Sequence, residues 1–174
     1  MHAEIVATGG AGPPLVYVPG IDGSGELLLD TAARLERRFR LTRLCYVGHE
    51  ARDHGALATS VERCLATLGA PRTLVLAESF GVGVALQLAL EHAPRVAGLA
   101  LVNGFARFPD RLGLALTRGV FALAPEAWIH RARARFLQRG LFAPRRDERA
   151  LQQLLALDGD WFGAGYRARL GMIR

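Results

Sequence analysis

Hydrophobic residues along this chain switch between short continuous runs and helical spacing. Runs of aliphatic or β-branched residues predict strands at 5–8, 15–18, 41–47, 74–76 and 96–102, with the first as an edge strand. Apolar residues three and four apart predict helices over Leu27–Phe39, over Gly55–Leu68 and after Ser79. Strands that alternate with helices in this way imply a three-layer α/β/α, doubly wound, mainly parallel sheet with right-handed crossovers.

Beyond Phe105 the pattern becomes helical throughout, which divides the chain into a core at 1–109 and a helical segment at 110–174. The expected apolar faces are Leu112, Leu116, Val120 and Leu123; then Trp128, Ala132 and Phe136; then Leu151, Leu154 and Leu155. Prolines and glycines at 125, 140, 144 and 159 separate these faces. Two arrangements remain open: a lid over the strand ends, or a helical tail packed on the sheet.

The segment Thr73–His92 predicts a buried strand, a sharp turn at Ser79 and an apolar helix. Ala77 and Gly81 flank Ser79, and small residues at these positions let a strand fold back tightly enough to expose the serine oxygen. The positive end of the following helix would face an oxyanion formed there. The competing interpretation is a tight strand-to-helix turn with an inert serine.

A second glycine-rich turn follows the strand at 15–18, within the sequence PPLVYVPGIDGSGELLL. Gly20, Gly23 and Gly25 would let this loop approach another backbone and expose N–H groups. A dinucleotide phosphate loop is the rival, but the glycines follow the order G-x-x-G-x-G rather than G-x-G-x-x-G, and Asp22 would repel a phosphate. The loop therefore fits an oxyanion hole better.

The motifs VPGIDGSG and AESFG, in this order, resemble the α/β-hydrolase superfamily, in particular its esterase, lipase and acyltransferase branch. The resemblance covers about 13–109. It implies Ser79 as the nucleophile and the backbone amides of Ile21 and Phe80 as the oxyanion hole. Pro19-Gly20 replaces the more usual His-Gly, a departure that the PGxDG branch shares. By the same resemblance, 110–174 corresponds to a helical cap over the acyl pocket.

The relatives place the triad histidine, and usually the acid, on loops beyond the cap. None of the five histidines here (His2, His49, His54, His92, His130) occupies that position, so we expect an incomplete, C-terminally truncated hydrolase fold. His49 is the histidine most expected near Ser79, although residues at loop ends are usually solvated. Asp110 could take the acid's place, but a helix-capping role fits it better.

Composition indicates one domain with a sizeable core, since the chain has 174 residues and 51% are hydrophobic. The N-terminus has no signal-peptide pattern, and no run approaches the roughly 18 apolar residues of a membrane span. Cys45 and Cys64 fall at core positions and are expected to be reduced. These features predict a cytoplasmic protein, and the sequence shows neither a metal-ligand cluster nor a cofactor motif.

All 22 basic residues are arginines, and the positive charge is confined to one segment. Residues 1–110 carry a net charge of −1, whereas 111–174 carry +7. Arg131, Arg135 and Arg139 form a stripe along one predicted helix. Few aromatic residues lie among them, so nucleic-acid binding is not indicated. Contact with anionic lipid or acyl substrates and a solvated helix face both remain open.

We therefore expect a serine hydrolase acting on a small-molecule carboxylic ester or thioester. The alternative is a non-catalytic, truncated or degenerate hydrolase that serves as an acyl-binding or interaction module. The strand Val96–Val102 would lie at an open sheet edge, which predicts a homo-oligomer.

Overall fold

The computed structural model of the 174-residue chain describes residues 1–50, 53–125, 127–129, 131, 135 and 163–173. The predictions for His130, Ala132, Phe136, Arg139 and the apolar face at 151–155 lie outside these residues.

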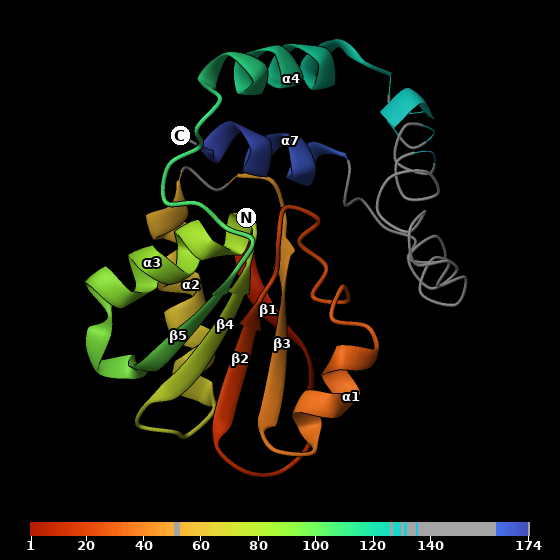
Figure 1. Ribbon diagram of the computed structural model, residues 1–174. Helices are drawn as coiled ribbons and strands as arrows, with labels where there is room; N and C mark the ends of the chain where they lie inside the picture. The colour runs from red at the N-terminus through yellow and green to blue at the C-terminus, as the bar shows by residue number, and fades with distance from the viewer. Residues whose placement is uncertain (51–52, 126, 130, 132–134, 136–162, 174) are drawn as a thin grey trace.

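A five-stranded sheet forms the centre of the molecule (Figure 1). Its strands are β1 (His2–Gly9), β2 (Pro14–Val18), β3 (Arg40–Val47), β4 (Thr73–Glu78) and β5 (Val96–Val102). They lie in the order β1-β3-β2-β4-β5, with β1 antiparallel to β3 and the other pairs parallel. This confirms the predicted mainly parallel sheet and the edge position of the first strand.

Helices cover both faces of the sheet. They are α1 (Asp30–Glu36), α2 (His54–Thr67), α3 (Phe80–Glu91), the short 3₁₀ turn η1 (Ala93–Arg95), α4 (Arg111–Leu123) and α7 (Ala164–Met172). The side chain of Asp53 caps α2 by accepting from Ala56 N–H at 2.9 Å. Asp110 caps α4 by accepting from Gly113 N–H at 2.8 Å, which confirms its helix-capping interpretation.

The first helix is shorter than the predicted Leu27–Phe39. Leu29 has φ 46°, a left-handed conformation that a leucine rarely adopts and that cannot continue a right-handed helix. Residues before it form turns, with Leu29 N–H donating to Glu26 O at 3.2 Å, and α1 begins at Asp30. Apolar spacing marked the packing face correctly but could not show that the chain turns before the helix begins.

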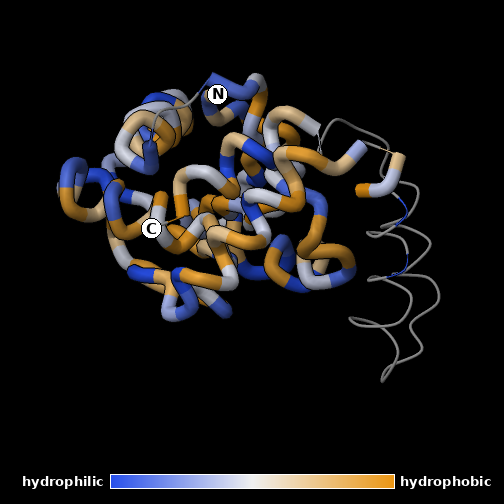
Figure 2. The backbone as a smooth tube through the Cα atoms, turned by 90° about the horizontal axis from the view of Figure 1, so that it is seen from above, coloured by the Kyte–Doolittle hydropathy of each residue, from blue (hydrophilic) through white to orange (hydrophobic). Residues whose placement is uncertain are grey.

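Alternate residues of β2 enter two different hydrophobic clusters, as the period of a strand requires. Val16 and Val18 pack with the residues of α2 and α3 on one face, whereas Leu15 and Tyr17 pack with residues of and around α1 on the other. All but Leu15 among these four are 0% exposed. Seen from above, the most hydrophobic part of the chain lies in the middle of the molecule (Figure 2). This burial on both faces establishes the predicted α/β/α layers.

The helices α4 and α7 lie together beyond the carboxyl ends of the strands (Figure 1). Leu114 is buried, and Phe121 stacks on Tyr166 of α7 with ring centroids 5.1 Å apart. The predicted apolar face of α4 instead points outward, with exposed fractions of 63–88% for Leu112, Leu116, Val120 and Leu123. Helical periodicity identified an apolar face, but α4 buries a different one.

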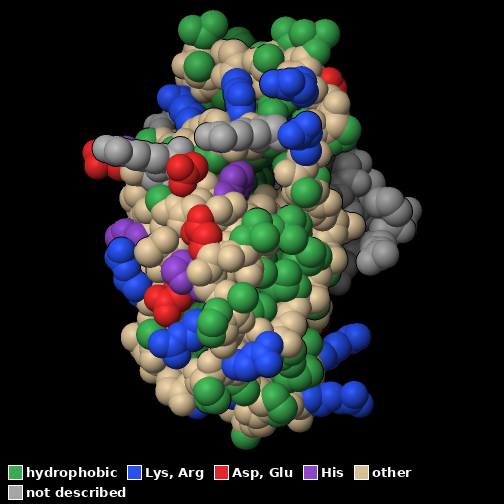
Figure 3. All heavy atoms as spheres, turned by 90° about the vertical axis from the view of Figure 1, so that its left-hand side faces the viewer, with side chains coloured by type: hydrophobic (Ala, Val, Ile, Leu, Met, Phe, Trp, Pro, Cys, Tyr) green, Lys and Arg blue, Asp and Glu red, His purple; other side chains and the backbone are tan. Residues whose placement is uncertain are grey.

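Strand β5 has β4 on one side and no further strand on the other within the described residues. Leu99, Leu101 and Val102 are 36–44% exposed, and Leu90 of the neighbouring helix α3 is 78% exposed. The face of the molecule that carries α3 and β5 has hydrophobic side chains gathered over its middle (Figure 3). An apolar strand edge of this kind favours pairing with another chain.

We predict that the 174-residue chain self-associates through β5. A charge on an edge strand opposes pairing, so Leu101→Arg should lower the mass measured by light scattering toward that of one chain. Leu123→Arg is the matched control, because Leu123 is 88% exposed but lies on α4, away from this edge. A stable monomer of the unmodified chain at high concentration would contradict the prediction. If only Leu123→Arg lowered the mass, the contact between chains would lie on the helices instead.

Candidate active site

Ser79 occupies the sharp turn between β4 and α3. Its backbone angles are φ 51° and ψ −117°, outside the regions that a residue with a side chain ordinarily adopts. Its N–H donates to Val102 O of β5 at 2.9 Å, which holds the turn against the neighbouring strand. The side chain is half-buried. The predicted strained turn at Ser79 is thus confirmed, and strain of this kind is concentrated at functional sites.

Two glycines allow this turn to touch the end of β2. A β-carbon on Gly81 would lie 2.5 Å from Pro19 O and 2.6 Å from Val18 O, closer than real atoms approach. A β-carbon on Gly20 would lie 3.5 Å from the Ser79 β-carbon. A side chain at Gly81 would force the two turns apart, whereas the distance at Gly20 is that of an ordinary van der Waals contact. The glycine-rich loop and the serine turn therefore form one site, as the sequence predicted.

The loop after β2 is held from behind by hydrogen bonds to its carbonyl groups. Tyr46 OH donates to Pro19 O at 3.2 Å, and Tyr46 N–H donates to Gly23 O at 2.8 Å. Within the loop, Gly23 N–H donates to Gly20 O at 3.1 Å. Because a peptide group is planar, fixing the Gly20 carbonyl also fixes the direction of the N–H on the opposite side of that peptide, which belongs to Ile21.

The backbone N–H groups of Ile21 and Phe80 have no acceptor within the described part of the chain, and the same holds for those of Asp22 and Gly81. Phe80 is the first residue of α3, where N–H groups have no intrahelical partner. Donors left open at the start of a helix favour negative charge. The arrangement can therefore stabilise an oxyanion formed beside Ser79.

Asp22 is folded back into its own loop and is only 7% exposed. Its Oδ2 accepts from Ser24 N–H at 2.8 Å and from Ser24 Oγ–H at 2.5 Å, while Oδ1 has no partner among the described atoms. A phosphate in this loop would lie beside a buried carboxylate. The structure therefore gives a physical basis for rejecting a dinucleotide site here.

Two buried tyrosines near the site are held as neutral donors. Burial is the main cause that raises the pKa of Tyr17 well above its usual value, and the neighbouring Glu78 charge raises it further. Tyr17 OH donates to Glu78 Oε2 at 2.7 Å. Burial likewise raises the pKa of Tyr46, although the Arg169 charge opposes the shift. Both phenols therefore support the turns rather than supply a base.

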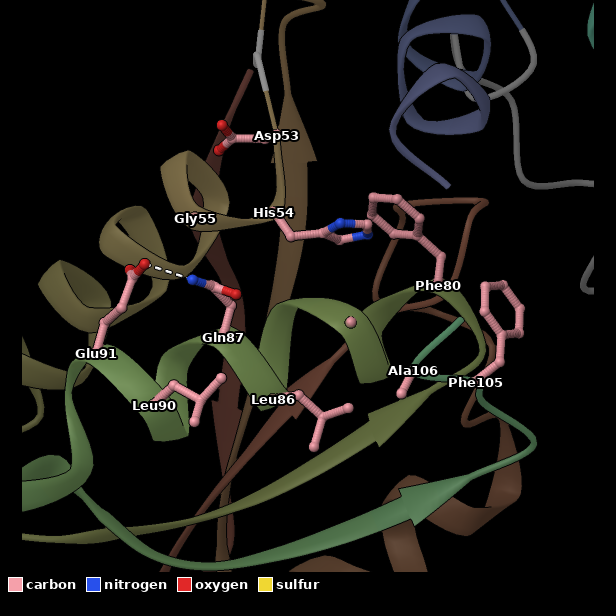
Figure 4. A pocket seen from close by; sticks show the side chains of 11 residues that line it. Asp53, His54, Gly55, Phe80, Leu86, Gln87, Leu90, Glu91, Phe105 and Ala106 are labelled. Carbon is pink, nitrogen blue, oxygen red and sulfur yellow. Dashed lines mark hydrogen bonds between the residues drawn. The ribbon is translucent and has the colours of Figure 1, made fainter. Parts of the chain in front are cut away.

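A cavity of about 450 Å³ lies beside the first turns of α3 (Figure 4). Its lining combines apolar side chains with two carboxylates, an amide and a histidine: Asp53, His54, Gly55, Phe80, Gly83, Leu86, Gln87, Leu90, Glu91, Phe105 and Ala106. Gln87 Nε2 donates to Glu91 Oε1 at 2.5 Å along one side. The cavity reaches the serine turn through Phe80, which directly follows Ser79, whereas Ser79 itself is not part of the lining.

His54 is the histidine that the structure brings against the serine turn. Its ring lies 4.9 Å from that of Phe80, centroid to centroid, and points toward it in Figure 4. Gly83 leaves room for this ring, because a β-carbon there would lie 2.9 Å from His54 Nε2. Sequence reasoning passed over His54, and the one available signal was a second glycine within the helix after Ser79.

The other described histidines make no hydrogen bond or ring contact with this turn. His49 is exposed beyond the end of β3, and His92 is the C-cap of α3. His2 bonds to the carboxylate of Glu4 at 2.7 Å, at the far edge of the sheet. The structure therefore does not bring His49 into the serine turn's described contacts, although the sequence made it the first candidate.

A buried arginine on α7 is a second residue that sequence reasoning missed. Arg169 is 2% exposed and donates from Nε to Ile21 O at 2.7 Å and from Nη2 to Asp22 O at 3.0 Å. The contacts join residues 148 and 147 positions apart in the chain. Only the folded arrangement could reveal them.

No cluster of three or more His, Cys, Asp or Glu residues suited to a metal occurs in the part of the chain that the structure describes. Among those residues, no helix is both long and apolar enough to cross a bilayer. Cys45 and Cys64 are free thiols but only half-buried, and burial raises the pKa of both. Their predicted reduced state is consistent with free thiols, whereas the structure only half-buries side chains that the sequence placed at core positions.

Comparison with known proteins finds a similar sequence that is named as a hydrolase. The chain is 28% identical over 130 residues to a protein named putative carbamate hydrolase RutD from Escherichia coli O157:H7 (strain EC4115 / EHEC). The match covers 67% of this chain and 48% of that protein, so the chain spans about half the length of the curated relatives it matches. No protein-family model matches the sequence.

Solved structures share the fold over nearly the whole chain. The esterase RhEst1 from Rhodococcus sp. ECU1013 has a TM-score of 0.74 at 23% identity, with 96% of this chain and 67% of that chain covered. An alpha/beta hydrolase fold protein from Burkholderia ambifaria has a TM-score of 0.72 at 20% identity, with 97% and 66% covered. At these identities the likeness establishes the fold.

We predict that Gly81→Ala lowers the free energy of unfolding by about 1–3 kcal/mol, the usual cost of forcing an atom into packed structure. The cause is the clash of the new β-carbon with two backbone carbonyls. Urea denaturation measures the change. Gly119→Ala on α4 is the control, since a β-carbon there meets nothing within 4 Å and should leave stability unchanged or slightly raised. Equal stability of both variants would show that the two turns are not in contact.

Proposed function

We propose that this chain, which has the α/β-hydrolase fold, carries a serine hydrolase site for carboxylic ester or thioester substrates. Ser79 is the nucleophile, and the N–H groups of Ile21 and Phe80 form the oxyanion hole. The observation that carries the proposal is the conformation of Ser79, at φ 51° and ψ −117°, in a turn packed against the glycine-rich loop after β2.

The chemistry follows from this arrangement. Ser79 Oγ attacks the carbonyl carbon, its proton passes to a base, and the carbonyl π electrons move onto oxygen. The Ile21 and Phe80 N–H groups and the positive end of α3 stabilise that oxyanion. Its collapse expels the alkoxide or thiolate, which takes up the proton, and leaves an acyl group on Ser79. Transfer of this acyl group to water gives hydrolysis.

The strength of the nucleophile depends on a base, and among the described residues His54 is the histidine whose ring contacts the serine turn, at Phe80. His130 lies outside those residues. A serine without a base retains the help of the oxyanion hole and of substrate binding alone. We therefore propose that the 174-residue chain is a weak catalyst, in keeping with the incomplete triad that the sequence predicts.

The helical segment 110–174 fits the place of a cap. Its described helices α4 and α7 lie beyond the carboxyl ends of the strands, which is where ligands bind in open α/β sheets. The cavity beside Phe80 offers an apolar wall of Leu86 and Leu90 with polar groups opposite. An acyl chain suits the apolar wall.

The alternative is a non-catalytic acyl-binding or interaction module with the same fold. It would use the cavity and the apolar edge of β5 without chemistry at Ser79. The two proposals differ in one property, the reactivity of the serine hydroxyl, because only catalysis requires an activated serine.

We predict that a fluorophosphonate probe labels Ser79. The chain has three serines, Ser24, Ser60 and Ser79, so peptide mass spectrometry assigns the adduct directly. Ser79→Ala should abolish labelling, whereas Ser60→Ala, which removes a buried hydroxyl far from the site, should retain it. Complete absence of label on a folded chain would favour the binding module.

We also predict slow hydrolysis of p-nitrophenyl acetate, with an acceleration of about 10³–10⁴ over water that disappears in Ser79→Ala. Phenyl carbamates belong in the same assay, because the E. coli relative is named a putative carbamate hydrolase. Fast turnover that depends on Ser79 would contradict the weak-catalyst proposal. His54→Gln and His49→Asn would then identify the base, and the contacts of His54 with the serine turn make it the first to test.

A further inference from the structure

Arg169 is a charged side chain that the proposed chemistry does not use, yet it is 2% exposed. Burying a guanidinium is costly unless its donors find good acceptors. Here the acceptors are backbone carbonyls of the loop that carries Ile21. The Nε–H donates to Ile21 O at 2.7 Å, and an Nη2–H donates to Asp22 O at 3.0 Å. The planar fork of arginine matches two successive carbonyls in a way that lysine cannot.

The space around the guanidinium is shaped for it by glycines from two distant segments. Gly23, at φ +72°, would place a β-carbon 2.8 Å from Arg169 Cζ. Gly165, one turn before Arg169 on α7, would place one 3.1 Å from Nη1. The Tyr46 ring lies 6.0 Å from Cζ. The second glycine of the sequence G-x-x-G in this loop, Gly23, is thus accounted for by an arginine far along the chain.

These contacts fix the loop at the residue that matters for catalysis. Gly20 O accepts from Gly23 N–H, and the next two carbonyls accept from Arg169. With the peptide groups on both sides of Ile21 held through their carbonyl oxygens, φ and ψ of Ile21 have little freedom. The Ile21 N–H is thereby aimed before any substrate arrives. Such preorganisation is what makes an oxyanion hole effective.

Arg169 is in turn held in place by the other described helix of the same segment. Arg118 of α4 donates from Nε to Leu170 O and from Nη2 to Gly171 O, both at 3.0 Å, and it also contacts Ile173 O. These carbonyls belong to the end of α7, where intrahelical partners run out. A chain of arginine-to-carbonyl bonds thus connects α4, α7 and the loop after β2.

We infer that Arg169 is a positioning residue for the oxyanion hole. Through this arginine, the helical segment at 110–174 fixes the direction of the Ile21 N–H. The inference rests on the proposed function for its catalytic consequence, but the hold on the loop is a separate property. Arg169 touches no reacting atom. It acts on the Ile21 N–H through the backbone.

The test combines loop exchange with labelling kinetics on the full chain. Arg169→Met removes the donors but keeps an apolar side chain, and Arg169→Lys keeps the charge without the fork. Gly165→Ala adds one methyl group against the guanidinium. Gly171→Ala is its matched control on the same helix, since a β-carbon there meets nothing within 4 Å. Arg167→Met controls for loss of an α7 arginine, because Arg167 donates to Ala124 O instead of to the loop.

We expect Arg169→Met and Gly165→Ala to speed hydrogen–deuterium exchange in the peptide covering residues 19–25. They should lower the saturating rate of fluorophosphonate labelling at Ser79 by about 10- to 100-fold, the scale of a small misplacement in an active site. The half-saturating probe concentration should hardly change. Arg169→Lys should fall between Arg169→Met and the unmodified chain, and both controls should match the latter.

The inference would be overturned if Arg169→Met and Gly165→Ala showed the same loop exchange and the same labelling rate as Gly171→Ala. If Arg169→Met fails to fold, the comparison of Gly165→Ala with Gly171→Ala tests the inference by itself. If the unmodified chain takes no label, the proposed function fails, and loop exchange still shows whether Arg169 holds the loop.

Discussion

The site depends on the close contact between two turns, one after β2 and one after β4. Pairing of these strands brings the turns to the same edge, and the absence of a side chain at Gly81 lets α3 approach the carbonyls of Val18 and Pro19. The chain leaves β2 toward α1 on one face and leaves β4 toward α3 on the other. Ligands in open α/β sheets bind where adjacent connections diverge in this way.

Much of this arrangement could be predicted from sequence because it is local. Continuous apolar runs gave the strands, and small residues around Ser79 gave the turn, since a tight strand-to-helix turn limits side-chain size. The positions of helix ends were harder to predict from the sequence. Leu29 adopts a positive φ that no periodicity reveals, so α1 begins at Asp30 rather than at Leu27.

The residues that could not be predicted are those whose roles come from contacts across the chain. Arg169 and His54 carry no local pattern, yet one holds the loop after β2 and the other packs on Phe80. A solvated helix face was one of two interpretations that the sequence left open for the arginine stripe of the helical segment. Arg131 and Arg135 are indeed exposed, but Arg118, Arg167 and Arg169 donate to backbone carbonyls. Part of the positive charge in this segment therefore has a structural use.

The central claim is that the Ile21 and Phe80 N–H groups receive the oxyanion formed at Ser79. A crystal structure of the chain with a phosphonate bonded to Ser79 Oγ tests it most directly, because the phosphoryl oxygen stands where the oxyanion would be. We expect this oxygen to lie about 2.7–3.1 Å from both backbone nitrogens. An adduct whose oxygen points to solvent, with neither nitrogen in reach, would contradict the account.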